Sequence, residues 1–172
     1  MNRVIGWTAL AVAAPAASAV KSYAPAGFET VNTAVIAASP AEVYAMLATP
    51  SRWWNGEHSY SGDATNMTLE ARAGGCFCER IPADGATIEH ARVVYAQPGK
   101  TLRLQGGLGP LQAEGVSATL TWSLKPVAAG TEVTQTYVVG GYVRGGPEAL
   151  APIVDRVLGE QLTRIQGVVS PR

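Results

Sequence analysis

The sequence predicts an α+β fold in which a curved antiparallel sheet wraps around a long C-terminal helix. Two observations carry this expectation. Short stretches rich in β-forming residues, separated by tight turns, fill most of the region from residue 67 to residue 140. The segment 147–169 instead repeats apolar residues at three- and four-residue steps, as an amphipathic helix does. Because no internal repeat or long linker interrupts this order, we expect a single domain.

The first 19 residues have the order of a secretory signal peptide. Arg3 precedes an apolar run, and Ala17-Ser18-Ala19 supplies the small residues of a cleavage site. The run is shorter than the ~20 apolar residues that a membrane-spanning helix needs. We therefore expect cleavage after Ala19, transport across the inner membrane to the periplasm, and a mature domain of residues 20–172 that is not inserted in the membrane.

The charge balance argues against nucleic acid as a partner. The chain has 13 basic and 13 acidic residues, and cleavage would remove only Arg3 from this count, leaving a net charge of about −1. Lysine and arginine are not clustered, so we expect neither nucleic acid nor an anionic membrane surface as the main partner. The sequence leaves the oligomeric state open.

The predicted elements follow one another closely. A strand is expected at 28–36, and Ser39 is a good N-cap for a helix that begins at Pro40 and ends before Pro50. Pro152 either starts the regular part of the long final helix or kinks it. The remaining strands are expected at 67–71, 75–82, 86–95, 100–106, 117–126 and 131–140, with Asp84-Gly85 and Ala129-Gly130 in hairpin turns.

Several local motifs accompany this order of elements. They are Ser39-Pro40-Ala41-Glu42-Val43-Tyr44, Arg52-Trp53-Trp54, Gly74-Gly75-Cys76-Phe77, Pro98-Gly99-Lys100-Thr101-Leu102-Arg103-Leu104 and Gly130-Thr131-Glu132-Val133-Thr134. With them, roughly residues 28–168 resemble the helix-grip proteins of the START and birch-pollen-allergen superfamily (SRPBCC). The resemblance is greatest to the branch of polyketide cyclases and activators of the heat-shock-protein ATPase. It implies an apolar cavity between sheet and helix, but no particular catalytic set, because members of this superfamily differ in function.

Aromatic residues are the first candidates for the lining of such a cavity. Trp53 and Trp54 cannot both point inward from an extended backbone, so we expect one to pack and the other to border the cavity. Trp122 alternates with threonines on a strand, a pattern that favours a core residue over a ligand contact. The full set of expected ligand-binding residues is Trp53, Trp54, Cys76, Cys78, Trp122, Tyr137, Tyr142, Leu150 and Val154.

Cys76 and Cys78 are the only cysteines of the chain. In a regular strand their Cα atoms would lie ~6.6 Å apart, whereas a disulfide needs Cβ atoms within ~3.5–4.5 Å. A bridge would therefore require a bulge or a strained geometry. From this geometry we expect reduced thiols, or a strained bridge, on one wall of the sheet.

The register of the hairpin that follows decides which residues face one another, and two registers are open. A two-residue turn at Asp84-Gly85 would place Glu79 opposite His90. This carboxylate and imidazole could act as a general acid–base pair if buried, or form a half-exposed ion pair.

The second register has a four-residue turn in which Pro82 pairs with Ala86. Cys78 would then face His90, with Cys76 on the same side, as in a site for a soft metal. Because Pro82 has no N–H group to donate to the closing pair, the first register is favoured, and we expect neither a metal nor a cofactor.

These observations favour a non-catalytic binding protein that is exported and holds a small apolar or amphipathic molecule in the cavity between sheet and helix. One alternative is a cyclase- or aromatase-like enzyme that uses Glu79 and His90 in the same cavity. Burial of this pair beside a roomy pocket would favour the enzyme. A third possibility is a protein-interaction module like the ATPase activators, although their cytosolic chaperone is not expected where a signal peptide would send this chain.

Overall fold

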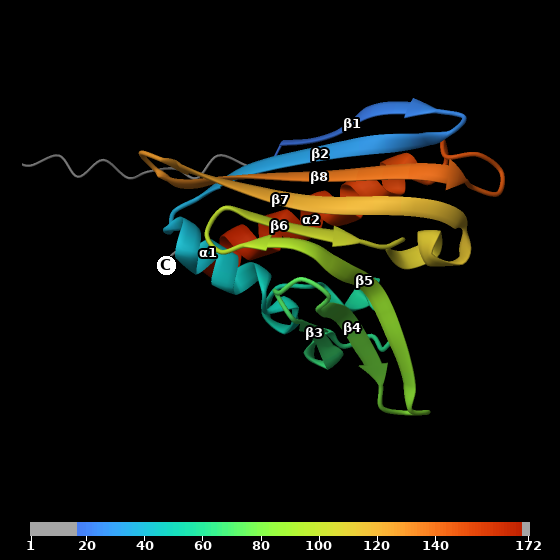
Figure 1. The fold of residues 1–172 in the computed structure, drawn as a ribbon, viewed down its shortest axis with the longest axis horizontal. Helices are drawn as coiled ribbons and strands as arrows, with labels where there is room; N and C mark the ends of the chain where they lie inside the picture. The colour runs from blue at the N-terminus through green and yellow to red at the C-terminus, as the bar shows by residue number, and fades with distance from the viewer. Residues whose placement is uncertain (1–16, 170–172) are drawn as a thin grey trace, which may run out of the picture.

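Within residues 17–169, which are the residues that the computed structural model describes, eight strands form one antiparallel sheet (Figure 1). Their order across the sheet is β1-β2-β8-β7-β6-β5-β4-β3. The strands are β1 (Ala17–Ala24), β2 (Gly27–Ile36), β3 (Met67–Leu69), β4 (Cys76–Ile81), β5 (Ala86–Gln97), β6 (Thr101–Gln105), β7 (Gly115–Val127) and β8 (Gly130–Tyr142). The helices are α1 (Pro40–Leu47) and α2 (Ala151–Val169), with 3-10 turns η1 (Pro50–Arg52), η2 (Gly56–His58), η3 (Ala64–Asn66) and η4 (Gly109–Ala113).

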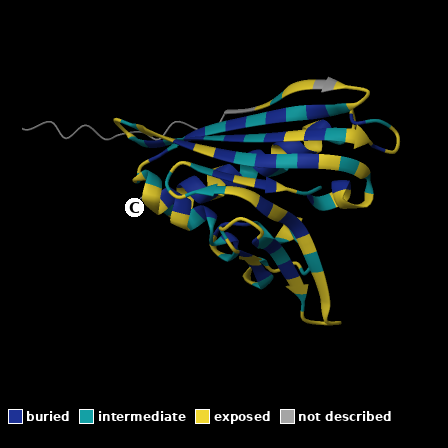
Figure 2. Cartoon of the chain, viewed as in Figure 1, coloured by how far each residue is buried: buried dark blue, intermediate teal, exposed yellow. Residues whose placement is uncertain are grey.

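Helix α2 lies along one face of the sheet, and the predicted α+β fold is confirmed (Figure 1). The strands alternate between buried and more exposed residues, as Figure 2 shows most regularly for β2, β7 and β8. This alternation is expected of a sheet that is covered on one face only. The core therefore lies between the sheet and α2. None of the helices in the described range is long and apolar enough to span a membrane.

The helix ends follow the predicted caps. The Ser39 hydroxyl accepts a hydrogen bond from the Glu42 amide at 3.4 Å, and the Glu42 carboxylate accepts one from the Ser39 amide at 2.8 Å, which completes a capping box at the start of α1. Helix α2 begins at Ala151 rather than at Pro147, because residues 147–150 form a turn. Pro152 therefore lies in the first turn of α2, where a missing N–H group costs nothing.

Strand β1 was not predicted, because its first residues coincide with the expected cleavage site. It pairs antiparallel with β2, and its register includes Ala19 opposite Val31. Cleavage after Ala19 would leave residues 20–24 of this strand. Residues 1–16 of the predicted signal peptide lie outside the described residues.

Next to its turn, the β4–β5 hairpin adopts neither of the two expected registers, whereas beyond Cys78 it follows the second one, with Cys76 opposite Arg92. Its turn contains residues 82–85 and is closed by Ile81 opposite Ala86, so that Pro82 lies inside the turn and needs no strand partner. The Asp84 side chain accepts a hydrogen bond from the Ala86 amide at 2.9 Å. Gly85 has a φ of 75°, a conformation that favours glycine.

A β-bulge interrupts this hairpin after a few residue pairs. Cys78 lies opposite Glu89, but the preceding Phe77 lies opposite Ala91, so His90 is an extra residue in β5. His90 and Ala91 are consecutive in the sequence, yet both are buried. The bulge thus directs His90 into the interior without turning the rest of β5 to the wrong face.

Candidate functional site

Glu79 and His90 form a buried pair at this bulge. The Glu79 Oε2 atom lies 2.9 Å from His90 Nε2, and the exposed fractions of the two side chains are 0% and 5%. The predicted contact between the two residues is therefore present, although Glu79 lies opposite Ile88 in the register and reaches His90 diagonally, two residues farther along β5.

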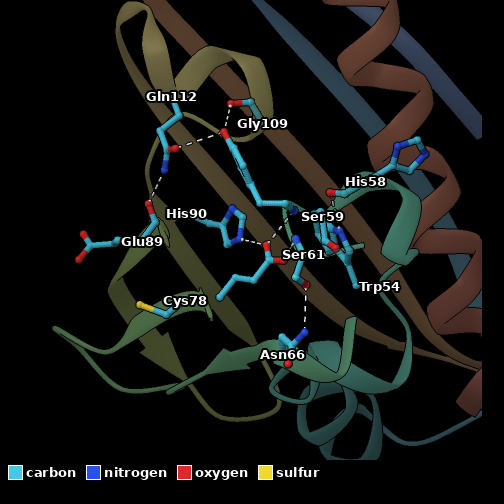
Figure 3. A network of polar contacts seen from close by, with 12 residues as sticks. Trp54, His58, Ser59, Ser61, Asn66, Cys78, Glu89, His90, Gly109 and Gln112 are labelled. Atoms are coloured by element: carbon cyan, nitrogen blue, oxygen red, sulfur yellow. Dashed lines mark hydrogen bonds and ion pairs between the residues drawn. The ribbon is translucent and has the colours of Figure 1, made fainter. Parts of the chain in front are cut away.

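The backbone of a neighbouring loop supplies further hydrogen bonds to the Glu79 carboxylate. Its carboxylate accepts hydrogen bonds from the Ser61 amide at 2.6 Å and from the Tyr60 amide at 3.1 Å. Figure 3 shows Ser61 and His90 close together in this network. A buried carboxylate is tolerated when several donors satisfy it, so Glu79 holds the 60–61 loop against the sheet.

The surroundings of the pair fix its protonation state. Burial by itself would raise the pKa of Glu79, but the hydrogen bonds from Ser61, Tyr60 and His90 together hold this pKa below its ordinary value. Burial lowers the pKa of His90 by more than the neighbouring carboxylate raises it. At neutral pH we therefore expect an ionised Glu79 that accepts a hydrogen bond from Nε2–H of a neutral His90.

A pocket of about 410 Å³ opens between α2 and two loops, and neither Glu79 nor His90 is among the residues that line it. Its wall is mainly apolar, with polar groups contributed by one of the loops. The lining residues are Trp54, His58, Ser59, Tyr60, Leu108, Gly109, Pro110, Ile153, Val154, Val157 and Leu158. The ring of Tyr60 links pocket and pair, because its centroid lies 5.8 Å from that of His90.

One wall of the pocket is fastened directly to α2. The Asn55 amide donates to the Gln161 side chain at 2.8 Å, and the Asn55 side chain donates to Glu160 at 2.6 Å. His58 Nε2 lies 3.0 Å from the same Glu160 carboxylate. Together these contacts fix the segment that carries Trp54, whose indole N–H donates to the His58 carbonyl oxygen at 3.0 Å.

The opposite wall is the glycine-rich segment that leads into η4. The buried Tyr137 hydroxyl donates to the Gly106 carbonyl oxygen and accepts from the Leu108 amide, both at 2.9 Å. Burial raises the pKa of Tyr137 far above its usual value despite the hydrogen bond from Leu108, so this hydroxyl stays protonated. Farther along, the Tyr60 hydroxyl lies 3.2 Å from both the Gly109 carbonyl oxygen and the Gln112 side chain (Figure 3).

Two of the nine expected ligand-binding residues, Trp54 and Val154, line the pocket. Trp53 is 1% exposed and packs behind Trp54, with ring centroids 5.5 Å apart. That Trp53, Trp54 and Val154 bind a ligand stays a prediction. The core encloses Trp122 and Tyr137 completely, and neither borders the pocket.

Tyr142 and Leu150 also lie outside the pocket. Tyr142 is 70% exposed, because the alternation along β8 places it on the same outer face as the exposed Val138. Leu150 belongs to the turn before α2 rather than to the helix, and it is only partly buried against the core.

The cysteines depart furthest from expectation. Cys76 and Cys78 form a disulfide, and their Cα atoms lie 5.4 Å apart instead of the spacing of a regular strand. The register shift between Phe77 and Cys78 supplies the irregularity that the bridge requires. Phe77 and Glu79 point into the core, so the disulfide lies on the opposite face of the sheet, away from the pocket (Figure 3 shows Cys78 directed away from His90).

No group of three or more potential metal-binding side chains occurs between residues 17 and 169. The second register is formed only at Cys76 and Phe77; Cys78 lies opposite Glu89 rather than His90, so the cysteines and His90 do not come together.

Residues 28–169 match the family described as polyketide cyclase/dehydrase and lipid transport. The chain belongs to this family. The polyketide cyclase/dehydrase and lipid transport family is associated with hydrophobic small molecules, which agrees with the apolar lining of the pocket. No curated protein sequence matches the chain.

Solved structures share the fold of this chain, and the predicted helix-grip fold is thereby confirmed. A protein from Mesorhizobium loti is 16% identical with a TM-score of 0.59, covering 81% of this chain and 95% of its own. A protein from Mycobacterium smegmatis is 14% identical with a TM-score of 0.60, covering 84% and 91%. The di-domain ARO/CYC protein StfQ of the steffimycin biosynthetic pathway is 15% identical with a TM-score of 0.55, covering 84% of this chain and 51% of StfQ.

Sequence reasoning missed most of the pocket lining. Val157 and Leu158 follow Val154 by three and four residues, so helical spacing alone could have added them. His58 is an exposed loop residue, but it also borders the pocket. The residues from the two loops carry no periodic pattern, and only the tertiary structure brings them to α2.

Proposed function

We propose that this protein binds one small apolar or amphipathic molecule in the pocket between α2 and the loops at residues 54–60 and 108–110. The observation that carries the proposal is the composition of the wall, which is apolar along α2 and polar at His58, Ser59 and Tyr60. Its volume of about 410 Å³ lies within the ~300–1,000 Å³ range of small-molecule pockets. Membership of a family that includes lipid transport supports the same ligand class.

Blocking the pocket from α2 tests this proposal. Val157 is half-buried in the pocket wall, and Val168 is an exposed valine farther along the same helix. We expect the neutral apolar probe N-phenyl-1-naphthylamine to bind wild type and Val168→Arg with one-to-one stoichiometry. Val157→Arg should weaken binding at least ~10-fold, since a charged side chain would have to be buried with the probe. Equal affinity of all three proteins in a fluorescence titration would place the binding elsewhere.

We also propose that the chain is exported and that the signal peptide is removed after Ala19. The order of basic start, apolar run and small residues in the sequence supports this location. An intact mass of the protein from the envelope fraction that begins at Val20 is expected. A mass that retains residues 1–19 would count against export by this route.

Acid–base catalysis is the second candidate function, and the burial of Glu79 and His90 beside the pocket favours it. A neutral imidazole held by a carboxylate can accept a proton, and Tyr60 is the side chain that contacts both His90 and the pocket. The likeness in fold to an ARO/CYC protein is compatible with cyclisation or dehydration as the reaction class.

Masses of bound molecules distinguish carrier from enzyme. Wild type and His90→Gln would be purified from the native host and their ligands released by denaturation. Chemistry by the pair predicts that the variant retains a precursor of different mass, heavier by one water for a dehydration. Identical ligands in both proteins would count against catalysis and would leave ligand binding as the only supported function.

A further inference from the structure

The Cys76–Cys78 disulfide is separate from the pocket, and its position gives it little value as a structural cross-link. The two cysteines are only two residues apart. Stabilisation by a disulfide grows with the length of the loop that it closes, and this loop is among the shortest possible. Both residues also belong to β4, which hydrogen bonds from β3 and β5 already hold in place.

The disulfide is accessible, and its two sulfur atoms have different neighbours. Cys76 and Cys78 are both partly exposed on the outer face of the sheet. Arg92 lies directly opposite Cys76, and Glu89 lies directly opposite Cys78.

The side chain of Arg92 is held in place beside Cys76. Its guanidinium donates to the Gly74 carbonyl oxygen at 3.0 Å, two residues before Cys76, and forms an ion pair with Glu89. Because the cation belongs to the register partner of Cys76 and the carboxylate to that of Cys78, we expect the thiolate form of Cys76 to be favoured over that of Cys78.

We propose that Cys76–Cys78 is a redox-active disulfide that exchanges with low-molecular-weight thiols. A thiolate RS⁻ attacks Sγ of Cys78, the S–S bond breaks, and its electron pair leaves on Sγ of Cys76 beside Arg92. A second RS⁻ attacks the external sulfur of the mixed disulfide and releases Cys78, and both cysteines take up the protons that the two thiols lost. The disulfide has gained two electrons, and two RSH have become RSSR.

Reduction of the folded protein by glutathione tests the exchange. The protein is incubated with ~10 mM reduced glutathione at pH 7 without denaturant, quenched with iodoacetamide, and the alkylated cysteines are counted by mass. We expect two alkylated cysteines and, at early times, glutathione attached to Cys78 in the peptide 73–80. If the native protein stays oxidised while guanidinium-unfolded protein is readily reduced, the disulfide is structural only and the proposal fails.

Substitutions at Arg92 test the asymmetry. Loss of the cation makes Cys76 a poorer leaving group, so Arg92→Gln should slow reduction by about two- to fivefold. Arg92→Lys keeps the charge and should stay close to wild type, as should Arg103→Gln, which removes an exposed arginine on β6. Far-ultraviolet circular dichroism checks that each variant is folded. Equal rates for Arg92→Gln and wild type would overturn the assigned role of Arg92.

Discussion

At the scale of single residues, the interior holds the ionisable pair Glu79 and His90. Burying a carboxylate is costly, and Glu79 is tolerated because two backbone amides and the His90 imidazole donate to it. The same contacts tie the 60–61 loop to β4. The pair is therefore structural as well as a candidate acid–base device, and its protonation should be visible in the stability of the fold.

Stability should fall on acidification below pH ~6.5, the ordinary pKa of histidine. The pKa of His90 is lowered in the folded protein, so between the folded and unfolded values the unfolded chain binds more protons, and the free energy of unfolding decreases as pH falls. The lowered pKa of Glu79 adds a further loss at more acidic pH, below the ordinary range of a glutamate. Urea denaturation between pH 8 and pH 5 measures the first part.

The chain offers a matched control, because it has two histidines. His90→Gln should flatten the stability profile between pH 7 and pH 5, although the variant starts from a lower stability. His58→Gln removes the exposed histidine beside Glu160 and should keep the profile of wild type. A profile that His90→Gln leaves as steep as in wild type would contradict a depressed histidine pKa.

The β4–β5 hairpin shows, at the scale of elements, how far the sequence could predict the fold. Turn residues and alternation located both strands, because these signals are local. The register was not predictable, because it depends on which faces Ile88, His90 and Val93 occupy across the sheet, and only a bulge directs all three toward the core side. The same register shift accommodates the Cys76–Cys78 bridge, so that the bridged alternative holds and not the reduced thiols.

Gly106, which follows β6, lies close to the bulge at residues 90–91 of β5, and this contact yields a prediction. A Cβ atom at Gly106 would collide with the His90 carbonyl oxygen and with Ala91, so Gly106→Ala should destabilise the protein by about 1–3 kcal/mol. Gly167 in α2 has open space around its Cα atom. Gly167→Ala should be neutral or stabilise by up to ~1 kcal/mol through helix propensity. Urea denaturation compares the two variants, and equal stabilities would show that the loop moves away freely.

The pocket was the least predictable part of the molecule. Val154 could be proposed because helical periodicity placed it on the apolar face of α2. Tyr60 and Leu108 come from loops almost fifty residues apart in the sequence, and no local pattern links them. Their proximity follows from the pairing of the whole sheet, which no local signal in one sequence contains.

Across the whole molecule, the sheet is open and its two outer strands are β1 and β3. Strand β3 is short, as protected edges often are. Strand β1 covers β2, which is ten residues long and carries Val31 and Val35 on its more exposed face. Without β1, a long strand with free N–H and C=O groups would face the solvent.

Truncation tests the protective role of β1. A chain that begins at residue 25 lacks β1 and should self-associate through the edge of β2, whereas a chain that begins at residue 17 retains the strand and serves as the control. Analytical ultracentrifugation at several concentrations measures the association. Identical sedimentation of the two chains would show that the edge of β2 needs no cover.

The two loops that line the pocket differ in the hydrogen bonds that hold them, and this difference has a consequence for the kinetics of ligand exchange. The wall at residues 53–58 is bonded to α2 through Asn55 and through Arg164, which donates to the Trp53 carbonyl oxygen at 2.7 Å. The tip of the other wall at Gly109 is joined to the facing loop by the Tyr60 hydroxyl, through contacts of 3.2 Å that a single side-chain rotation breaks. A molecule would enter and leave past Tyr60, so the dissociation rate would depend on rotation of this side chain far more than on the helix that provides the apolar wall.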